Sequence, residues 1–177
     1  MSAEPLPPRA SDYETALKTD DRLELRLWLR LLTCSTLIER RVRRGLREAF
    51  DITLPRFDLL AQLDRAPDGL TLSELSRRLM VSNGTVTGLV ERLGAEGLIE
   101  SRAQKGDRRA QRVRLTGAGK RAFDTMTPIH EAWIAAMLAP LDRRDMAALY
   151  ALLGKLKAAV AARPETPARP ARRARGS

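Results

Sequence analysis

The feature that most constrains this chain is the stretch Leu72–Leu93, LSELSRRLMVSNGTVTGLVERL, whose apolar residues recur as two short crossed helices require. Thr71 and Glu74 form an S/T-x-x-E capping box for the first helix, and Ser82 is a favourable N-cap for the second. The spacing predicts a helix-turn-helix, a motif whose second helix contacts base edges in the DNA major groove. The residues expected at this contact are Ser82, Asn83, Thr85, Val86 and Thr87.

Two glycines interrupt the second helix of this motif. Gly84 and Gly88 each cost about 1 kcal/mol of helix propensity relative to alanine. Either the helix approaches DNA so closely that side chains are excluded there, or packing elsewhere tolerates the two glycines.

The composition bounds the class of protein. The chain has 177 residues, enough for one domain with a hydrophobic core, and its formal net charge of +10 favours an anionic partner such as nucleic acid. Part of that charge lies in the last residues, ARPARRARGS, which can equally be a solubilising tail. Cys34 is the only cysteine and His130 the only histidine, so we expect no disulfide framework, no metal site, no cofactor and no enzyme activity.

The N-terminus predicts no targeting segment. It reads MSAEPLPPRASDYE, which is acidic and proline-rich and has no apolar core of a signal peptide. No apolar run approaches the roughly 18 residues that a membrane span needs. We therefore expect a cytoplasmic protein with no membrane partner.

Long helices are predicted on both sides of the helix-turn-helix. In residues 20–50 the apolar stripe is wider than one intramolecular contact requires, which suggests a subunit interface. Residues 117–162 predict a long helix capped by Thr116 and a last helix that begins at Asp142. The sequence thus predicts four parts: a flexible arm at 1–19, a helical dimerisation region at 20–50 and 117–162, a DNA-binding lobe at 51–116, and a disordered basic tail at 163–177.

Within the lobe, the segment after the second helix changes character. Leu98-Ile99 and Val113–Leu115 are short strand-like pieces, separated by a loop that holds the basic sequence KGDRR at 105–109. This pattern predicts a β-hairpin with a long basic tip.

The helix-turn-helix, basic hairpin and flanking helices together resemble the MarR family of transcriptional regulators. The most specific match is DRRAQRVRLTGAGK, which is similar to the family's D-x-R…L-T…G pattern at Asp107, Arg109, Leu115, Thr116 and Gly119. The chain departs from the family where Met80 replaces a customary glycine before the turn, Gly88 a frequent arginine and Ser101 a usual arginine.

The resemblance implies a mainly α fold with a small β-hairpin wing, that is, a winged helix-turn-helix in a dimeric MarR-like architecture. It implies a homodimer that binds a pseudo-palindromic, double-stranded DNA operator as a repressor. In the wing, Asp107 would pair with Arg109, and Arg108 or Arg109 would enter the minor groove. Phosphate contacts would come from Arg102, Lys105 and Arg112.

Two further strings, SNGTVTGLVERL and LRLWLRLLTCSTLIE, are similar to family members that sense hydroxycinnamoyl-CoA thioesters. Those members repress phenylpropanoid-degradation genes until the thioester binds, which suggests a role in aromatic catabolism and p-coumaroyl-CoA or feruloyl-CoA as the effector. Four arginines, Arg40, Arg43, Arg44 and Arg47, share one helical face. They form either a solvated surface or the site of the CoA phosphates. The expected ligand-binding residues are Trp28, Cys34, Ile38, Arg40, Arg43, Arg44, Arg47, Phe57, His130 and Trp133.

Several of these residues have a second interpretation. Trp28 and Trp133 are typical core residues, His130 suits a subunit interface, and Cys34 is either a small buried apolar residue or a peroxide-sensing thiol. A free aromatic acid or an oxidant remains an alternative signal. Two other classes remain open: an architectural nucleic-acid binder without an effector, and a protein-interaction module with a degenerate winged helix.

Overall fold

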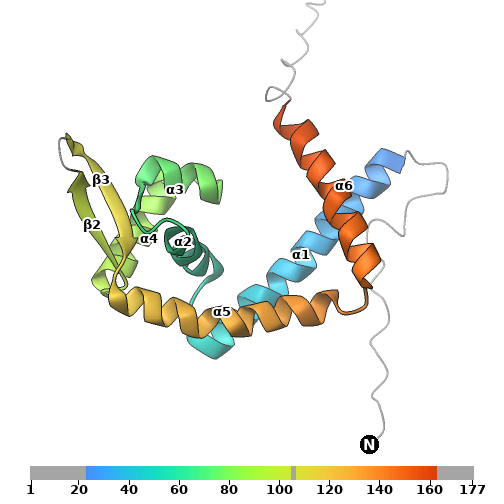
Figure 1. Cartoon of the computed structure of the whole chain (residues 1–177), viewed down its shortest axis with the longest axis horizontal. Helices are drawn as coiled ribbons and strands as arrows, with labels where there is room; N and C mark the ends of the chain where they lie inside the picture. Colours follow the sequence, from blue (N-terminus) through green and yellow to red (C-terminus); the bar gives the residue numbers. More distant parts are fainter. Residues whose placement is uncertain (1–22, 105–106, 163–177) are drawn as a thin grey trace, which may run out of the picture. The chain divides into compact units, whose positions relative to one another are not determined.

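The computed structural model describes residues 23–104 and 107–162, except for the side chains of 103, 104 and 107–111. The predicted arm at 1–19, Lys105 and the predicted tail at 163–177 lie outside the described residues. The elements in chain order are α1 (Leu23–Phe50), α2 (Leu54–Asp64), β1 (Leu70–Thr71), α3 (Leu72–Leu79), α4 (Asn83–Ala95), β2 (Ile99–Gln104), β3 (Asp107–Leu115), α5 (Gly117–Leu138) and α6 (Arg143–Ala161) (Figure 1).

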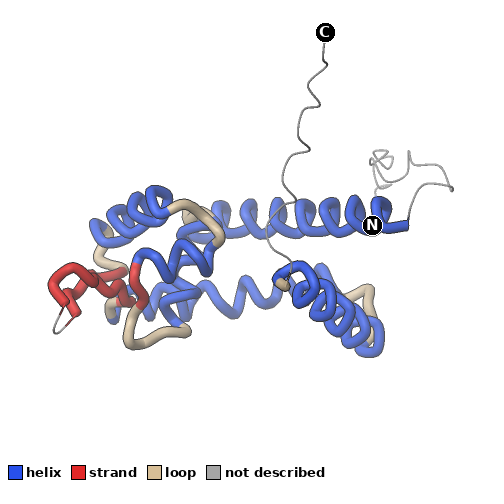
Figure 2. Tube along the Cα trace, turned by 90° about the horizontal axis from the view of Figure 1, so that it is seen from above, coloured by secondary structure: helices blue, strands red, loops and turns tan. Residues whose placement is uncertain are grey.

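The chain divides into two compact units between Ala136 and Met137. The first unit contains α1 to α4, the sheet and most of α5, and the second contains α6. Helix therefore dominates, as predicted, and the strands form one small sheet (Figure 2). None of the described helices is long and apolar enough to cross a lipid bilayer.

The helix-turn-helix forms where the sequence predicted it. Thr71 accepts a hydrogen bond from the backbone N–H of Glu74 at 3.2 Å, and the Glu74 carboxylate accepts one from the Thr71 N–H at 2.8 Å, which confirms the capping box. The Ser82 hydroxyl accepts from the Thr85 N–H at 3.2 Å at the start of α4. Between the helices, the Ser76 hydroxyl donates to the Val81 carbonyl at 2.5 Å. Local side-chain bonds thus fix both helix starts and the turn.

The turn shows why the family pattern has a glycine at the position of Met80. Met80 ends α3 in the left-handed conformation, with φ of 54°, and its side chain is 92% exposed. Glycine adopts this conformation without steric cost, whereas other residues pay about 1 kcal/mol or more. The position therefore requires the backbone geometry that glycine favours, although the sequence supplies methionine.

The wing is longer than predicted. β2 and β3 pair antiparallel from Ile99↔Leu115 to Gln104↔Asp107, so only residues 105 and 106 separate the strands. The long basic loop predicted for the tip was wrong, since Asp107, Arg108 and Arg109 belong to β3. Backbone hydrogen bonds extend a hairpin without apolar side chains, which is why hydrophobicity underestimated the strands.

The sequence missed the third strand altogether. The sheet order is β1-β3-β2, and β1 pairs antiparallel with β3 through Leu70↔Val113 and Thr71↔Arg112. A strand of two residues carries no periodic signal of its own. Its identity depends on β3, which lies far along the chain.

The core of the lobe is built from short helices and the sheet. α2 buries Phe57, Leu59, Leu60, Ala61 and Leu63. The largest fully buried side chains of the described residues are Leu46, Leu59, Leu60, Leu63, Leu75, Val86, Leu93 and Val113. They come from α1, α2, α3, α4 and β3. The position of α4, the second helix of the helix-turn-helix and its candidate recognition helix, is therefore fixed by tertiary packing.

The junction between the wing and α5 is held by one threonine. The Thr116 hydroxyl donates to the Gly97 carbonyl at 2.7 Å and accepts from the Gly119 N–H at 3.0 Å, while its backbone N–H donates to the Leu98 carbonyl at 3.0 Å. A Cβ atom at Gly119 would lie 1.9 Å from the Leu98 carbonyl oxygen. The L-T…G pattern is thus a packing device that joins the end of α4 to the start of α5.

Replacing Gly119 with alanine is expected to destabilise the fold by about 2 kcal/mol or more, because the backbone of Leu98 cannot yield to a contact of 1.9 Å. Chemical denaturation of the full chain measures this change. Gly94→Ala is the matched control, since nothing lies within 4 Å of a Cβ there and helix propensity favours alanine. Equal stability of the two variants would contradict the packing role.

A second cluster packs α1 and α2 against α5. The His130 ring lies 4.8 Å from the Phe57 ring, centroid to centroid, and Phe57 also contacts Phe123 at 5.4 Å. The Trp133 ring contacts Phe50 and covers Gly45, where a Cβ would lie 2.9 Å from it. Burial lowers the pKa of His130 below its ordinary value of 6.5, with Glu131 acting in the opposite direction.

His130 therefore makes stability depend on pH. Because its folded pKa is depressed, the unfolded chain binds more protons near pH 6, so this stability is present above about pH 6.5 and is lost as the pH falls through the folded pKa. The stability difference between the wild type and His130→Gln is expected to shrink from pH 7.5 to pH 5. Urea titrations across this range measure it, and a constant difference would rule out the contribution of His130.

Candidate DNA-binding surface and ligand cavity

α4 presents a polar, exposed face at its N-terminal end. Ser82, Asn83, Thr85 and Thr87 are exposed, as a helix that reads base edges requires. The Ser82 and Thr85 hydroxyl oxygens lie 2.9 Å apart, and the Thr87 hydroxyl donates to the Asn83 carbonyl at 3.0 Å. The Asn83 side chain offers both a donor and an acceptor, which suits the edge of adenine.

The prediction of a base contact at Val86 was wrong. Its side chain is fully buried, as is Leu93 one heptad later. Val86 packs in the core because it lies on the inner face of α4, opposite to Gly84 and Gly88. The N-terminal position of Val86 in the helix suggested a base contact, but the helical phase decides the direction of its side chain.

Two basic residues on the outer side of α3 were missed. Arg77 and Arg78 lie in the last turn of α3, and both are exposed. The first helix of a helix-turn-helix crosses the DNA backbone, so these guanidinium groups are candidate phosphate contacts. Their position in the last turn of the first helix was the available signal.

The base of the wing is fixed by ion pairs. Arg114 donates to the Glu100 carboxylate at 2.6 Å, and this hydrogen bond lowers the pKa of Glu100. Arg102 is exposed and lies 3.3 Å from the same carboxylate, so it remains a candidate phosphate contact. The Arg112 guanidinium donates to the Gly69 carbonyl at 2.7 Å. This hydrogen bond links β3 to the turn before β1. The predicted phosphate contact of Arg112 is therefore not supported.

The other wing predictions concern side chains outside the described residues. Lys105 lies in the undescribed gap between β2 and β3, and the side chains of Asp107, Arg108 and Arg109 are not described. Only the strand position of the last three is known, and it places them next to the turn of the hairpin. Their DNA contacts stay predictions.

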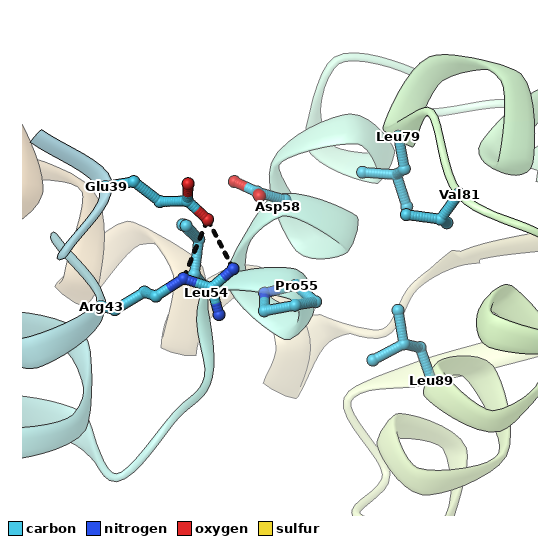
Figure 3. A pocket seen from close by; sticks show the side chains of 8 residues that line it. All are labelled: Glu39, Arg43, Leu54, Pro55, Asp58, Leu79, Val81 and Leu89. Atoms are coloured by element: carbon cyan, nitrogen blue, oxygen red, sulfur yellow. Dashed lines mark hydrogen bonds and ion pairs between the residues drawn. The ribbon is translucent and has the colours of Figure 1, made fainter. Parts of the chain in front are cut away.

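A cavity of about 210 Å³ lies beside the helix-turn-helix (Figure 3). Its wall has three sources: α1, the N-terminal half of α2, and the helix-turn-helix. The lining residues are Glu39, Arg43, Leu54, Pro55, Asp58, Leu79, Val81 and Leu89. A ligand in this cavity would contact both α1 and the element that carries the recognition helix.

The polar side of the cavity combines one guanidinium with two carboxylates. The Glu39 carboxylate accepts from Arg43 Nε at 2.9 Å and from Arg43 Nη2 at 2.5 Å. Asp58 is half-buried, and burial raises the pKa of its carboxyl group; Glu39 adds to the rise and Arg43 opposes it. Asp58 is therefore a carboxylate in a partly dry site.

The predicted ligand-binding residues do not form one site. Arg43 lines the cavity, whereas Phe57, His130 and Trp133 belong to the packed cluster of α1, α2 and α5. The other predicted ligand-binding residues are exposed along α1; they are Trp28, Cys34, Ile38, Arg40, Arg44 and Arg47. Cys34 is thus not a buried residue of this chain, contrary to one interpretation of the sequence.

The arginine face of α1 is only partly available. Arg43 pairs with Glu39, and Arg44 donates to Glu48 at 2.8 Å, one helical turn away. Such i, i+4 ion pairs are typical of a solvated helix face. For Arg43 and Arg44 they support a solvated surface rather than a site for the CoA phosphates. The cavity was missed because the residues that line it, Asp58 and Leu79 among them, lie far apart along the chain.

Comparison with known proteins identifies the family. A family model described as MarR family matches residues 50–110. A solved MarR family transcriptional regulator from Silicibacter pomeroyi is 32% identical with a TM-score of 0.67, and the match covers 81% of this chain and 99% of that chain. The chain belongs to the MarR family.

Other known proteins match most of the chain. The transcriptional activatory protein BadR of Rhodopseudomonas palustris is 28% identical over 132 residues, 72% of this chain and 75% of BadR. The structure of the S. aureus MepR–DNA complex has a TM-score of 0.66 at 24% identity, covering 73% of this chain and 94% of that chain. BadR and the Silicibacter pomeroyi protein are transcriptional regulators, so the prediction of a DNA-binding regulator that is not an enzyme is confirmed.

In this MarR-family protein the two glycines of α4 have no packing explanation. Nothing in the structure lies within 4 Å of a Cβ at Gly88, and only the Ser82 hydroxyl lies at 4.0 Å from a Cβ at Gly84. Both positions are on the outer face of α4, four residues apart. Alanine there would satisfy the fold better than glycine, which favours the interpretation of close approach to DNA.

Gly88→Ala is therefore expected to raise the free energy of unfolding by about 1 kcal/mol and to weaken DNA binding by about tenfold. Denaturation and fluorescence anisotropy, with labelled DNA from upstream of the protein's own gene, measure the two effects. Gly94→Ala, near the other end of α4, is the control that gains stability without losing affinity. Unchanged DNA affinity in Gly88→Ala would show that the glycine is merely tolerated.

Proposed function

We propose that this protein is a homodimeric repressor of aromatic catabolism genes, released from a pseudo-palindromic operator by an aromatic acyl-CoA thioester. The observation that carries DNA recognition is the polar, exposed face of α4, held by the buried Val86 and Leu93 beside an antiparallel wing. The MepR–DNA complex, which has the same fold, supports this use of the surface. Dimers of helix-turn-helix proteins bind half-sites about one helical turn apart.

The exposed apolar faces of α1 and α6 support a dimer. On α1, Leu23 is 73% exposed and Trp28 is 56% exposed; on α6, Tyr150 is 83% exposed and Leu152 is 62% exposed. Exposed apolar side chains gathered on one element often mark a protein–protein interaction site. A second copy of the chain is the partner that covers such faces in MarR regulators. The width of the apolar stripe in residues 20–50 led to the same expectation.

The cavity supplies a route from effector to DNA. Leu79, Val81 and Leu89 belong to the helix-turn-helix, whereas Glu39 and Arg43 belong to α1 (Figure 3). A ligand between them favours one spacing of α4 relative to α1. Repression is relieved if the favoured spacing no longer fits two half-sites, and the effector must prefer that state, because equal affinity for both states shifts nothing.

Two arginines support a thioester as the effector. Arg40 and Arg47 are exposed on the α1 face that also carries Arg43, so an acyl group in the cavity would leave CoA phosphates near them. Guanidinium groups bind phosphate through charge-assisted hydrogen bonds. The resemblance of α1 and α4 to thioester-sensing members points to the same class.

The test is release of DNA measured by fluorescence anisotropy at fixed salt. p-Coumaroyl-CoA and feruloyl-CoA are expected to release the labelled upstream DNA, and the free acids are not. The double variant Arg40→Ala/Arg47→Ala is expected to need about tenfold more thioester, since two charge-assisted contacts are lost. Arg65→Ala, an exposed arginine at the end of α2, is the control.

Three outcomes would contradict this proposal. Release by the free acids alone would make the effector an ordinary aromatic carboxylate. Release by peroxide, abolished in Cys34→Ser, would make the signal an oxidant. Equal affinity for unrelated DNA would replace the repressor with an architectural nucleic-acid binder.

A further inference from the structure

The cavity beside the helix-turn-helix has two chemically distinct sides. Leu54 and Pro55 of α2, together with the helix-turn-helix residues, form an apolar wall. The other side carries Glu39, Arg43 and Asp58, whose charged groups lie toward one another in Figure 3. An occupant must therefore be largely apolar and carry one polar group at the end that meets these residues.

The polar side disfavours an anionic group. Two carboxylates and one guanidinium give this side a formal charge of −1, and the Glu39 carboxylate already accepts two N–H groups of Arg43. A ligand carboxylate would have to displace Glu39 and then face Asp58. Like charges in a partly buried site repel each other, so the arginine does not make this an anion site.

Asp58 instead lacks a donor. Among the described residues, no hydrogen bond or ion pair is formed by its carboxylate, although the residue is only partly accessible to water. Partial burial of a carboxylate is unfavourable until a donor reaches it, and the burial is already apparent in the raised pKa of this group. A ligand hydroxyl that displaces water from this site would donate a hydrogen bond to the carboxylate.

Size and charge narrow the class of donor. Cavities of about 150 Å³ hold a benzene ring, so a cavity of about 210 Å³ has room for a phenol. Arg43 on the same side repels a cationic amine, whereas none of the three charged groups repels a neutral donor. A neutral hydroxyaryl group therefore suits both the apolar wall and the carboxylate.

We propose that this cavity binds the hydroxyaryl end of the effector, with the Asp58 carboxylate accepting the hydrogen bond of the phenolic hydroxyl. This inference rests on the proposed function in taking the aromatic thioester as the natural ligand. It adds a specificity that the thioester class alone does not contain, because Asp58 discriminates between acyl groups with and without a ring hydroxyl.

Calorimetric titration of the full chain with p-coumaroyl-CoA and cinnamoyl-CoA tests this specificity, since the two thioesters differ only in the ring hydroxyl. The wild type is expected to bind the hydroxylated thioester about tenfold more tightly. Asp58→Leu is expected to abolish that preference, whereas Asp58→Asn keeps part of it because the amide oxygen still accepts a hydrogen bond. Asp68→Asn, on the exposed turn after α2, is the matched control that leaves it intact.

Two results would overturn the inference. One is equal affinity of the wild type for both thioesters. The other is a preference for the hydroxylated thioester that persists in Asp58→Leu.

Failure of the thioester proposal is distinguished by probes without CoA. p-Ethylphenol is expected to raise the melting temperature of the wild type more than ethylbenzene does, and Asp58→Leu is expected to lose that difference. This pattern without any response to thioesters would retain the cavity inference and reject the effector. Thioester release of DNA without any effect of the hydroxyl would retain the effector and reject the inference. No response to either kind of probe would reject both.

Discussion

The hydrogen bonds of Thr116 are the constraint on which the geometry of the DNA-binding surface depends. One side chain joins the carbonyl of Gly97, just after α4, to the N-terminus of α5, and its own N–H holds the Leu98 carbonyl. The recognition helix and the wing therefore share one anchor, and Gly119 is excluded from carrying a side chain by the same carbonyl. A dimer that presents two such surfaces reads DNA only if each surface is rigid.

The cavity is lined in part by the same helix-turn-helix whose position Thr116 helps to fix. Leu79 and Val81 flank the turn between α3 and α4, and Leu89 is on α4 itself. An occupant of this cavity contacts the helix-turn-helix from behind, away from the exposed polar face. Regulation and recognition can then use different faces of one small motif, which is a way for a ligand to change the spacing of recognition helices without competing for DNA.

Sequence patterns predicted the local structure well wherever a short-range signal exists. The capping box of Thr71 and Glu74 and the N-caps at Ser82 and Asp142 all depend on neighbours within a few residues. The sequence did not predict strand β1 or the full length of the wing, because backbone pairing between distant segments leaves no periodic pattern in a charged sequence. The site was predicted least well: Val86 is buried, Arg112 donates to a backbone carbonyl, and the cavity is assembled from α1, α2 and the helix-turn-helix.

The sequence by itself determined most of the helical segments, the caps of α3, α4 and α6, and the family to which the chain belongs, because caps, helical spacing and motif residues are local properties of the chain. The tertiary structure decided which of those residues face DNA, which face the core and which meet in a cavity. Asp58 shows the difference. Its neighbours in sequence mark it as an ordinary polar position of α2, and only the approach of Glu39 and Arg43 from α1 makes it a half-buried carboxylate without a donor.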